Sequence, residues 1–280
     1  MNILTAIQQG SYILKKNNID SFNLDAEILL GEIIKKDRSF IILNHQKNLS
    51  HKEYTKYLFK INKRSKKTPI AYLIKKKAFW KDDFFVSQGV LIPRPDTELV
   101  VEKVLEYSKN RNNINILDIG TGSGCILLSI LRERKFFRGI GIDIDKIAVE
   151  NARLNMKRLH LNNRAKILKT DVDNFNLGKY DIIISNPPYI NRFDYYKLDK
   201  DILNFEPKKA LYGGLDGTSE IKKVIIKASW LLKKKGRLFL EIAHDHKNKV
   251  VSILKKNKFY INHIARDLSG HNRCIISTKN

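Results

Sequence analysis

The stretch that decides the fold reads Leu117-Asp118-Ile119-Gly120-Thr121-Gly122-Ser123-Gly124. The short apolar run 115–117 leads into it, and residues 125–131 continue as the apolar pattern of a buried helix. Glycines at every second position let the backbone turn tightly and approach a ligand closely. The stretch therefore predicts a strand, a tight turn and a helix whose first N–H groups face an anionic group such as a carboxylate.

Strand-like and helical segments alternate from about residue 114 onward. The strand-like runs are 115–117, 139–142, 165–168, 180–185, 237–241, 259–261 and 273–276. Helical patterns fill most of the intervals, as at 147–159 and 219–232. This order predicts an α/β fold with an open, mostly parallel, seven-stranded Rossmann-like sheet and helices on both faces. Only a loop separates the last two runs, so we expect one antiparallel strand at the edge.

The part of the chain before residue 98 has a different pattern. Residues 1 to about 75 have helical spacing, and Ser50 with Glu53 has the spacing of a capping box. The aromatic and β-branched runs up to residue 97 are separated by Asp82-Asp83 and by Gln88-Gly89, which predicts a β-hairpin. Asp96 or Thr97 would cap the helix that follows. We expect a helical docking domain at 1–75, a hairpin connector at 76–97 and the α/β domain at 98–280.

Composition narrows the class of protein. The chain has 280 residues, 42% of them hydrophobic, which suits a globular protein with a substantial core. It has no run of about 18 apolar residues and no basic, then apolar, leader, so we expect a cytoplasmic protein without a membrane span. Cys125 and Cys274 lie in apolar patterns and are expected to be buried, reduced thiols.

The net charge of +24 is spread over many short lysine runs. Such a charge could steer an acidic or ribonucleoprotein-associated partner, or it could be compositional drift. The basic residues form no arginine-rich or aromatic-interleaved stripe, so nucleic-acid binding is possible but is not predicted.

Two acids point to the ligand of the glycine loop. Asp118 directly precedes the loop, and Asp143 ends the second strand, where ribose hydroxyls bind in dinucleotide folds. The loop is G-x-G-x-G and departs from the dinucleotide pattern G-x-G-x-x-G. A ligand with an ammonium, a carboxylate and an adenosine but no phosphate would explain both acids, and S-adenosylmethionine has all of these groups.

The third strand ends in Thr170-Asp171-Val172. Asp171 could accept the adenine amine with Val172 against the ring, or Asp171 could simply cap a helix. Both interpretations of Asp171 stay open.

The fourth strand ends in Asn186-Pro187-Pro188-Tyr189. Two prolines cannot continue a sheet, so the chain turns there and leaves the Asn186 amide at the carboxyl end of a strand. The Asn186 side chain and the proline carbonyls offer acceptors that can hold an –NH2 group by both hydrogens. This arrangement suits chemistry on a planar nitrogen, either an amide or an exocyclic base amine.

With Pro93-Arg94-Pro95-Asp96-Thr97-Glu98, the glycine loop, Asp143 and Asn-Pro-Pro-Tyr in this order, the chain resembles the HemK/PrmC family nearly end to end. Phe205-Glu206-Pro207, Ala210-Leu211 and the stretch 214–217 also look like that family. Its members are glutamine N5-methyltransferases that modify the Gly-Gly-Gln loop of class I peptide chain release factors. The resemblance implies a class I methyltransferase domain, S-adenosylmethionine as methyl donor and release factors as protein substrates.

The resemblance also implies roles for residues. The set expected to bind the cofactor is Asp118, Gly120, Thr121, Gly122, Ser123, Gly124, Asp143, Asp171, Val172 and Asn186. Asn186, Pro187, Pro188 and Tyr189 would hold the substrate glutamine, with Asn186, Pro187 and Tyr189 acting in catalysis. No metal is implied. His244, His246 and His271 lack ligand spacing and are expected at the surface or at an edge.

Three other functions remain open at this point. The protein could instead methylate a glutamine of a ribosomal protein, because the loops that choose a protein substrate carry no motif. The same Asn-Pro-Pro-Tyr geometry would serve adenine-N6 methylation of nucleic acid. A non-catalytic binding protein with a vestigial cofactor fold is the third. Arg94 and Glu206 could support the substrate loop or form a structural ion pair.

Overall fold

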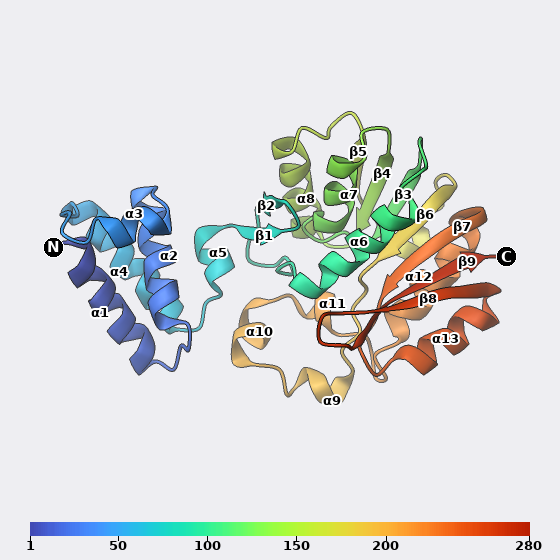
Figure 1. The fold of residues 1–280 in the computed structure, drawn as a ribbon. Coiled ribbons are helices and arrows are strands. Elements are labelled where there is room, and N and C mark those ends of the chain that lie inside the picture. The colour runs from blue at the N-terminus through green and yellow to red at the C-terminus, as the bar shows by residue number, and fades with distance from the viewer. The chain divides into compact units, whose positions relative to one another are not determined.

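The computed structural model describes all 280 residues and divides the chain into two compact units (Figure 1). The first unit is Met1–Lys76 together with Lys200–Phe205. The second is Lys77–Asp199 together with Glu206–Asn280. A short helix far along the sequence therefore belongs to the N-terminal unit.

The first unit is entirely helical, as its spacing predicted. Its helices are α1 (Ile3–Lys16), α2 (Phe22–Ile34), α3 (Arg38–Leu43), α4 (His51–Ser65), α5 (Ile70–Ile74) and α10 (Lys200–Phe205). Apolar side chains of α1, α2 and α4 pack into one core. The predicted capping box is confirmed, because the Glu53 N–H donates to Ser50 Oγ and the Ser50 N–H donates to Glu53 Oε2.

A buried ion pair ties α4 to α2 inside this unit. Arg64 Nε lies 2.6 Å from Asp25 Oδ2, and the two side chains are only 11% and 5% exposed. Arg64 Nη1 also donates to the Thr68 carbonyl and lies 3.4 Å from Asp201 Oδ2 on α10. One guanidinium thus joins three segments of the first unit.

A small antiparallel hairpin opens the second unit, with β1 (Lys77–Phe79) paired to β2 (Asp82–Phe84). The predicted hairpin exists, but its predicted turn at Asp82-Asp83 is wrong, since both residues lie in β2. The chain turns instead at Trp80, in the left-handed region at φ 56°. The Phe79 and Phe84 rings pack edge to face within the hairpin, and residues 90–92 form no strand.

The second unit is built on a seven-stranded sheet in the order β5-β4-β3-β6-β7-β9-β8. The strands are β3 (Asn115–Ile119), β4 (Arg138–Asp143), β5 (Ala165–Lys169), β6 (Tyr180–Ser185), β7 (Leu232–Glu241), β8 (Phe259–Arg266) and β9 (Asn272–Lys279). β3 to β7 are parallel to one another, and β9 is antiparallel to both β7 and β8. The seven predicted strands are confirmed, with longer bounds in most cases.

The antiparallel strand is not at the edge, where we expected it. β9 lies between β7 and β8, so β8 is the edge strand. The residues explain this placement. Four consecutive residues of β9 are buried, which is typical of an interior strand, whereas only two of the eight residues of β8 are buried.

Side-chain alternation along the strands supplies both faces of the sheet with a core. Ile116, Ile182 and Ile184 pack with α6 (Glu98–Tyr107), α7 (Cys125–Glu133) and α8 (Lys146–Arg158). Leu117, Ile183 and their register neighbours pack with α12 (Ser219–Leu231) and α13 (Lys247–Lys256). Figure 1 shows the two helical layers on either side of the sheet.

Short helices fill the connections of the second unit. They are η1 (Pro95–Thr97), η2 (Val172–Asn174), α9 (Arg192–Tyr195) and α11 (Lys208–Leu211). Cys125 and Cys274 are buried and are not joined to one another, as predicted. None of the helices combines the length and the apolar character needed to span a bilayer.

The buried ion pair of the first unit gives a test of its stability. Arg64→Met would leave the Asp25 carboxylate buried without its cation, which costs about 3–5 kcal/mol. We expect thermal unfolding to begin at a clearly lower temperature in this variant. Arg38 pairs with Glu27 but is 58% exposed, so Arg38→Met should change stability by about 1 kcal/mol or less. Equal effects of the two substitutions in calorimetry would contradict the structural role of the Arg64 pair.

Candidate active site

A cavity lies where β3 and β6 run side by side and the strand order reverses. Ile119 and Ser185 are register partners at the ends of these strands, and Ser185 Oγ donates to the Ile119 carbonyl at 2.7 Å. The cavity has an empty space of ≈ 920 Å³ including its open mouth. Such crevices at the carboxyl ends of parallel strands are the usual ligand sites of α/β folds.

The glycine loop forms one wall of the cavity. Gly120 and Gly122 have φ of 74° and 56°, and a side chain added at either would meet no atom within 4 Å. No side chain therefore covers the backbone of these two glycines on the cavity side. Their positive φ angles are ones that glycine adopts without strain. The N–H groups of Gly120 and Thr121 both donate to the Ile142 carbonyl, which fastens the loop to β4.

Four residues expected to bind the cofactor do not line the cavity, namely Asp118, Thr121, Ser123 and Gly124. The Thr121 hydroxyl donates to Asp118 Oδ2 at 2.7 Å, while Asp118 Oδ1 is buried without a partner. Burial raises the pKa of Asp118 to about 7, against the lowering effect of the Thr121 hydroxyl. Ser123 is buried, and its carbonyl accepts from Asn155 Nδ2. Gly124 is the N-cap of α7.

Asp143 joins the two strand ends at the wall of the cavity. Its Oδ2 accepts the Gly122 N–H and its Oδ1 accepts the Asp145 N–H, each at 2.9 Å. Burial raises the pKa of Asp143, and the two backbone donors oppose that shift. Each carboxylate oxygen can accept a second hydrogen bond, so the group keeps capacity for a hydroxyl ligand.

Asp171 and Val172 also line the cavity, at the end of β5. The Asp171 side chain accepts from the Asp173 N–H, so the capping interpretation of this residue is confirmed. Its second oxygen makes no such bond. Val172 packs against the core on the α12 side of the sheet.

Asn186, Pro187 and Pro188 line the cavity directly after β6. Asn186 Nδ2 donates to Thr97 Oγ1 at 3.2 Å, which leaves Oδ1 as the free acceptor of that side chain. The next residues are fastened to the 211–213 segment by the Ile190 and Gly213 N–H groups. Gly213 approaches so closely that an added Cβ would lie 2.6 Å from the Pro188 carbonyl oxygen.

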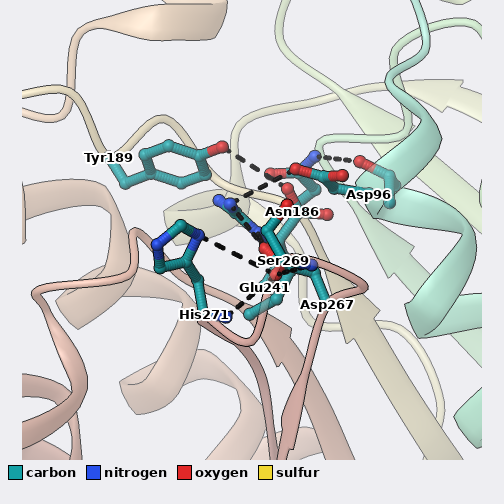
Figure 2. A network of polar contacts seen from close by, with 9 residues as sticks. Asp96, Asn186, Tyr189, Glu241, Asp267, Ser269 and His271 are labelled. Carbon is teal, nitrogen blue, oxygen red and sulfur yellow. Dashed lines mark hydrogen bonds and ion pairs between the residues drawn. The ribbon is translucent and has the colours of Figure 1, made fainter.

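Tyr189 does not line the cavity; its hydroxyl donates to Glu241 Oε1 at 3.4 Å (Figure 2). Glu241 ends β7 and is almost fully buried. Burial raises the pKa of Glu241 to about 7, while Thr97, Arg273 and Tyr189 lower it. Sequence reasoning missed Glu241, because a single acid at the end of an apolar strand matches no motif.

Thr97 occupies the N-cap position of α6, but the expected side-chain cap by Asp96 or Thr97 is not formed. Neither its side chain nor that of Asp96 makes a capping hydrogen bond there, because η1 continues directly into α6. Thr97 instead bonds Asn186, and Asp96 lies 3.3 Å from Arg273. Arg273 also binds Asp267 at 2.9 Å, so the β8–β9 loop and η1 meet around one guanidinium (Figure 2).

Arg94 and Glu206 form an ion pair at 2.5 Å, and Glu206 Oε2 also accepts the Ile92 N–H. This favours the structural interpretation of both residues. The pair links the segment before η1 to the segment after α10, next to the cavity residue Pro207.

Several cavity residues were not predicted. They are chiefly apolar or peripheral: Val90, Leu91, Ile142, Ile144, Asp145, Ala148, Lys209, Glu220 and Val224. Ile144 and Asp145 follow Asp143 directly, so their position beside a strand end could have indicated them. Val224 lies within an ordinary helical pattern and carries no such signal.

The histidine expectation needs one correction. His244 and His271 are exposed, but His246 is buried at the start of α13, where burial lowers its pKa. The 214–217 turn covers its ring, since a Cβ added at Gly217 would lie 2.5 Å from His246 Cε1. No group of three or more His, Cys, Asp and Glu side chains is arranged to hold a metal ion.

Known proteins with similar sequences fit this architecture. The family model described as "PrmC N-terminal domain" matches residues 5–74, and the model described as "Methyltransferase small domain" matches residues 95–206. The release factor glutamine methyltransferase of Clostridium acetobutylicum is 36% identical over 282 residues, which cover 100% of this chain and 99% of that protein. Its counterpart from Buchnera aphidicola subsp. Schizaphis graminum is 39% identical over 267 residues, covering 95% of this chain and 96% of the relative.

A solved methyltransferase from Pyrococcus furiosus shares the fold, with a TM-score of 0.54 at 21% identity over 73% of this chain and 92% of that one. This likeness supports the methyltransferase fold of the second unit. The full-length identities carry the family assignment, and the resemblance drawn from the motifs is confirmed. The chain belongs to the family of the release factor glutamine methyltransferases.

Proposed function

We propose that this protein transfers a methyl group from S-adenosylmethionine to the N5 side-chain amide of the Gly-Gly-Gln glutamine in class I peptide chain release factors. The observation that carries the proposal is one cavity lined both by the glycine loop and by Asn186-Pro187-Pro188. Family membership supports the same activity, since the relatives are named for it.

The cavity residues suit this cofactor. S-adenosylmethionine supplies an electrophilic methyl group on a sulfonium. The bare backbones of Gly120 and Gly122 would accept its close approach, and the Asp143 carboxylate has capacity for ribose hydroxyls. Asp171 and Val172 would face the adenine. When ionised, Asp118 would place negative charge behind the loop that suits the ligand's ammonium, and its Oδ1 has no partner of its own.

The amide nitrogen of glutamine is a weak nucleophile, because its lone pair is delocalised into the carbonyl. No strong base lines the cavity beside Asn186, so positioning is the economical source of rate. Asn186 Oδ1 and the Pro187 carbonyl would accept the two amide hydrogens. They would aim the nitrogen at the methyl group and stabilise the positive charge that develops on it. The proton then leaves to water.

Tyr189 acts in this proposal through its neighbours. Its ring packs among the apolar residues on the α12 face, and its hydroxyl binds Glu241. It would hold the Asn-Pro-Pro turn rigid from outside the cavity. Docking of the release factor through the helical first unit rests on the family resemblance.

Methyl transfer itself is the first test. Purified protein with methyl-labelled S-adenosylmethionine should label a class I release factor, and the label should be lost when the glutamine of its Gly-Gly-Gln motif is changed. Parallel reactions with ribosomal protein and with DNA serve as controls. Label on either of these in place of the release factor would replace the proposed substrate, and no label anywhere from folded protein would favour a non-catalytic binder.

Asn186→Ala should lower turnover of release factor by about 10²-fold or more, because it removes an acceptor that orients the nucleophile. Cofactor affinity, measured by calorimetry, should change much less. Asn257→Ala is the matched control, since its amide only donates to the Ile253 carbonyl at the end of α13. Full turnover in folded Asn186→Ala protein would contradict the proposal that Asn186 positions the substrate amide.

Asp143→Ala should weaken S-adenosylmethionine binding by about 10-fold or more, because a buried carboxylate that holds hydroxyls and fastens Gly122 is lost. Turnover at saturating cofactor should fall less than affinity. Glu150→Gln on the exposed face of α8 removes a comparable charge outside the cavity and should leave the dissociation constant unchanged. Unaltered binding in Asp143→Ala would contradict the assigned role.

A further inference from the structure

The orientation of the Asn186 side-chain amide decides whether its oxygen or its nitrogen faces the substrate. Its oxygen accepts and its nitrogen donates, yet the two ends have nearly the same shape, so only its hydrogen-bond partners decide which end faces a ligand. If Asn186 turned its –NH2 toward the cavity, it would meet the –NH2 of the incoming glutamine with donors on both sides. The acceptor needed by the proposed reaction would then point away.

In the structure, a buried hydroxyl makes this choice. Asn186 Nδ2 donates to Thr97 Oγ1 at 3.2 Å, and Thr97 is only 3% exposed. A hydroxyl has one proton and two lone pairs. Thr97 can accept from Asn186 without conflict when its own proton goes to another acceptor.

The acceptor for that proton is Glu241. Glu241 is buried, and its Oε2 has no hydrogen-bond partner, so the carboxyl has a free acceptor. Thr97 is among the groups that lower the pKa of this acid, which favours a bond from the Thr97 hydroxyl to the carboxylate. An ionised carboxylate can only accept, and it therefore fixes the direction of the whole chain of donors: Asn186 to Thr97 to Glu241.

We propose that Thr97 and Glu241 are positioning residues that hold the Asn186 amide with its oxygen toward the substrate nitrogen. This inference rests on the proposed methylation of an amide nitrogen. Neither residue touches the substrate. They act by preventing the alternative orientation of the Asn186 side chain, which does touch the substrate.

The charge state of Glu241 adds a testable consequence. Its surroundings are Thr97 and Asp96 on η1, Tyr189 after β6, Arg273 and Cys274 on β9, and Cys125 on α7. Burial raises the pKa of Glu241 to about 7. Once protonated, Glu241 can donate to Thr97, and Thr97 can then donate to Asn186 Oδ1, which reverses the amide. Turnover should therefore fall as pH drops through about 7.

The kinetic experiment uses the full-length protein with release factor as substrate. Thr97→Val keeps the shape but loses the hydroxyl, and should lower kcat about 10–100-fold while KM and cofactor affinity change little. Thr97→Ser restores the hydroxyl and should recover most of the rate. Ser277→Ala removes a buried hydroxyl that has no hydrogen-bond partner on β9, and it should have no effect.

A readout without substrate keeps this inference separate from the proposed function. With ¹⁵N-asparagine labelling, the side-chain amide signal of Asn186 is identified by its loss in Asn186→Asp. It should titrate with a midpoint near 7 in the wild type, shift in Thr97→Val, and not titrate in Glu241→Gln. If the signal is the same in wild type and Thr97→Val, the positioning role is wrong. If it behaves as expected but no release factor is methylated, the proposed function fails and the orientation of Asn186 stands.

Discussion

The pairing of β3 with β6 is the constraint on which the site depends. Their register places Ile119 opposite Ser185, so the glycine loop and Asn186 leave the sheet at the same level. The Ser185 hydroxyl bonds the Ile119 carbonyl and closes the gap between the two strand ends. A shift of one residue would turn Ile182 and Ile184 from one helical layer toward the other and separate a methyl donor from its acceptor. The apolar alternation that builds the two cores therefore also fixes the geometry of the chemistry.

Sequence reasoning reached the fold because its signals are local. Buried strand runs, the glycine turn and the capping box at Ser50 each depend on neighbours within a few residues. The errors arose where partners are distant. The hairpin turn is a local exception: it lies at Trp80, between Phe79 and Phe84, whose rings pack together. β9 lies inside the sheet because it pairs with β7, far earlier in the chain, as well as with β8. Neither preference is visible in composition alone.

The site residues also divide into those with a local sequence signal and those whose partners are distant in the sequence. Gly120, Gly122, Asp143 and Asn186 follow strands in recognisable patterns, and the structure brings all four to one cavity. Thr97 and Glu241 are far from Asn186 in sequence and have no motif of their own. Sequence reasoning read Thr97 as a helix cap, which is the commonest use of threonine before a helix. Only the folded structure shows that the Thr97 hydroxyl lies between the Asn186 amide and the buried Glu241 carboxyl.

The inclusion of α10 in the first unit affects how the chain acquires its structure. Residues 200–205 are preceded and followed by residues of the second unit, so the chain passes between the two units three times. During synthesis, the N-terminal helices emerge long before α10 and can collapse around their own apolar core. At that stage the Arg64 guanidinium can already bind Asp25 and the Thr68 carbonyl. Its contact with Asp201 can form only after α10 has been synthesised. The N-terminal unit is consequently completed only after most of the sheet has been made, which couples the maturation of two parts that look separate in the sequence.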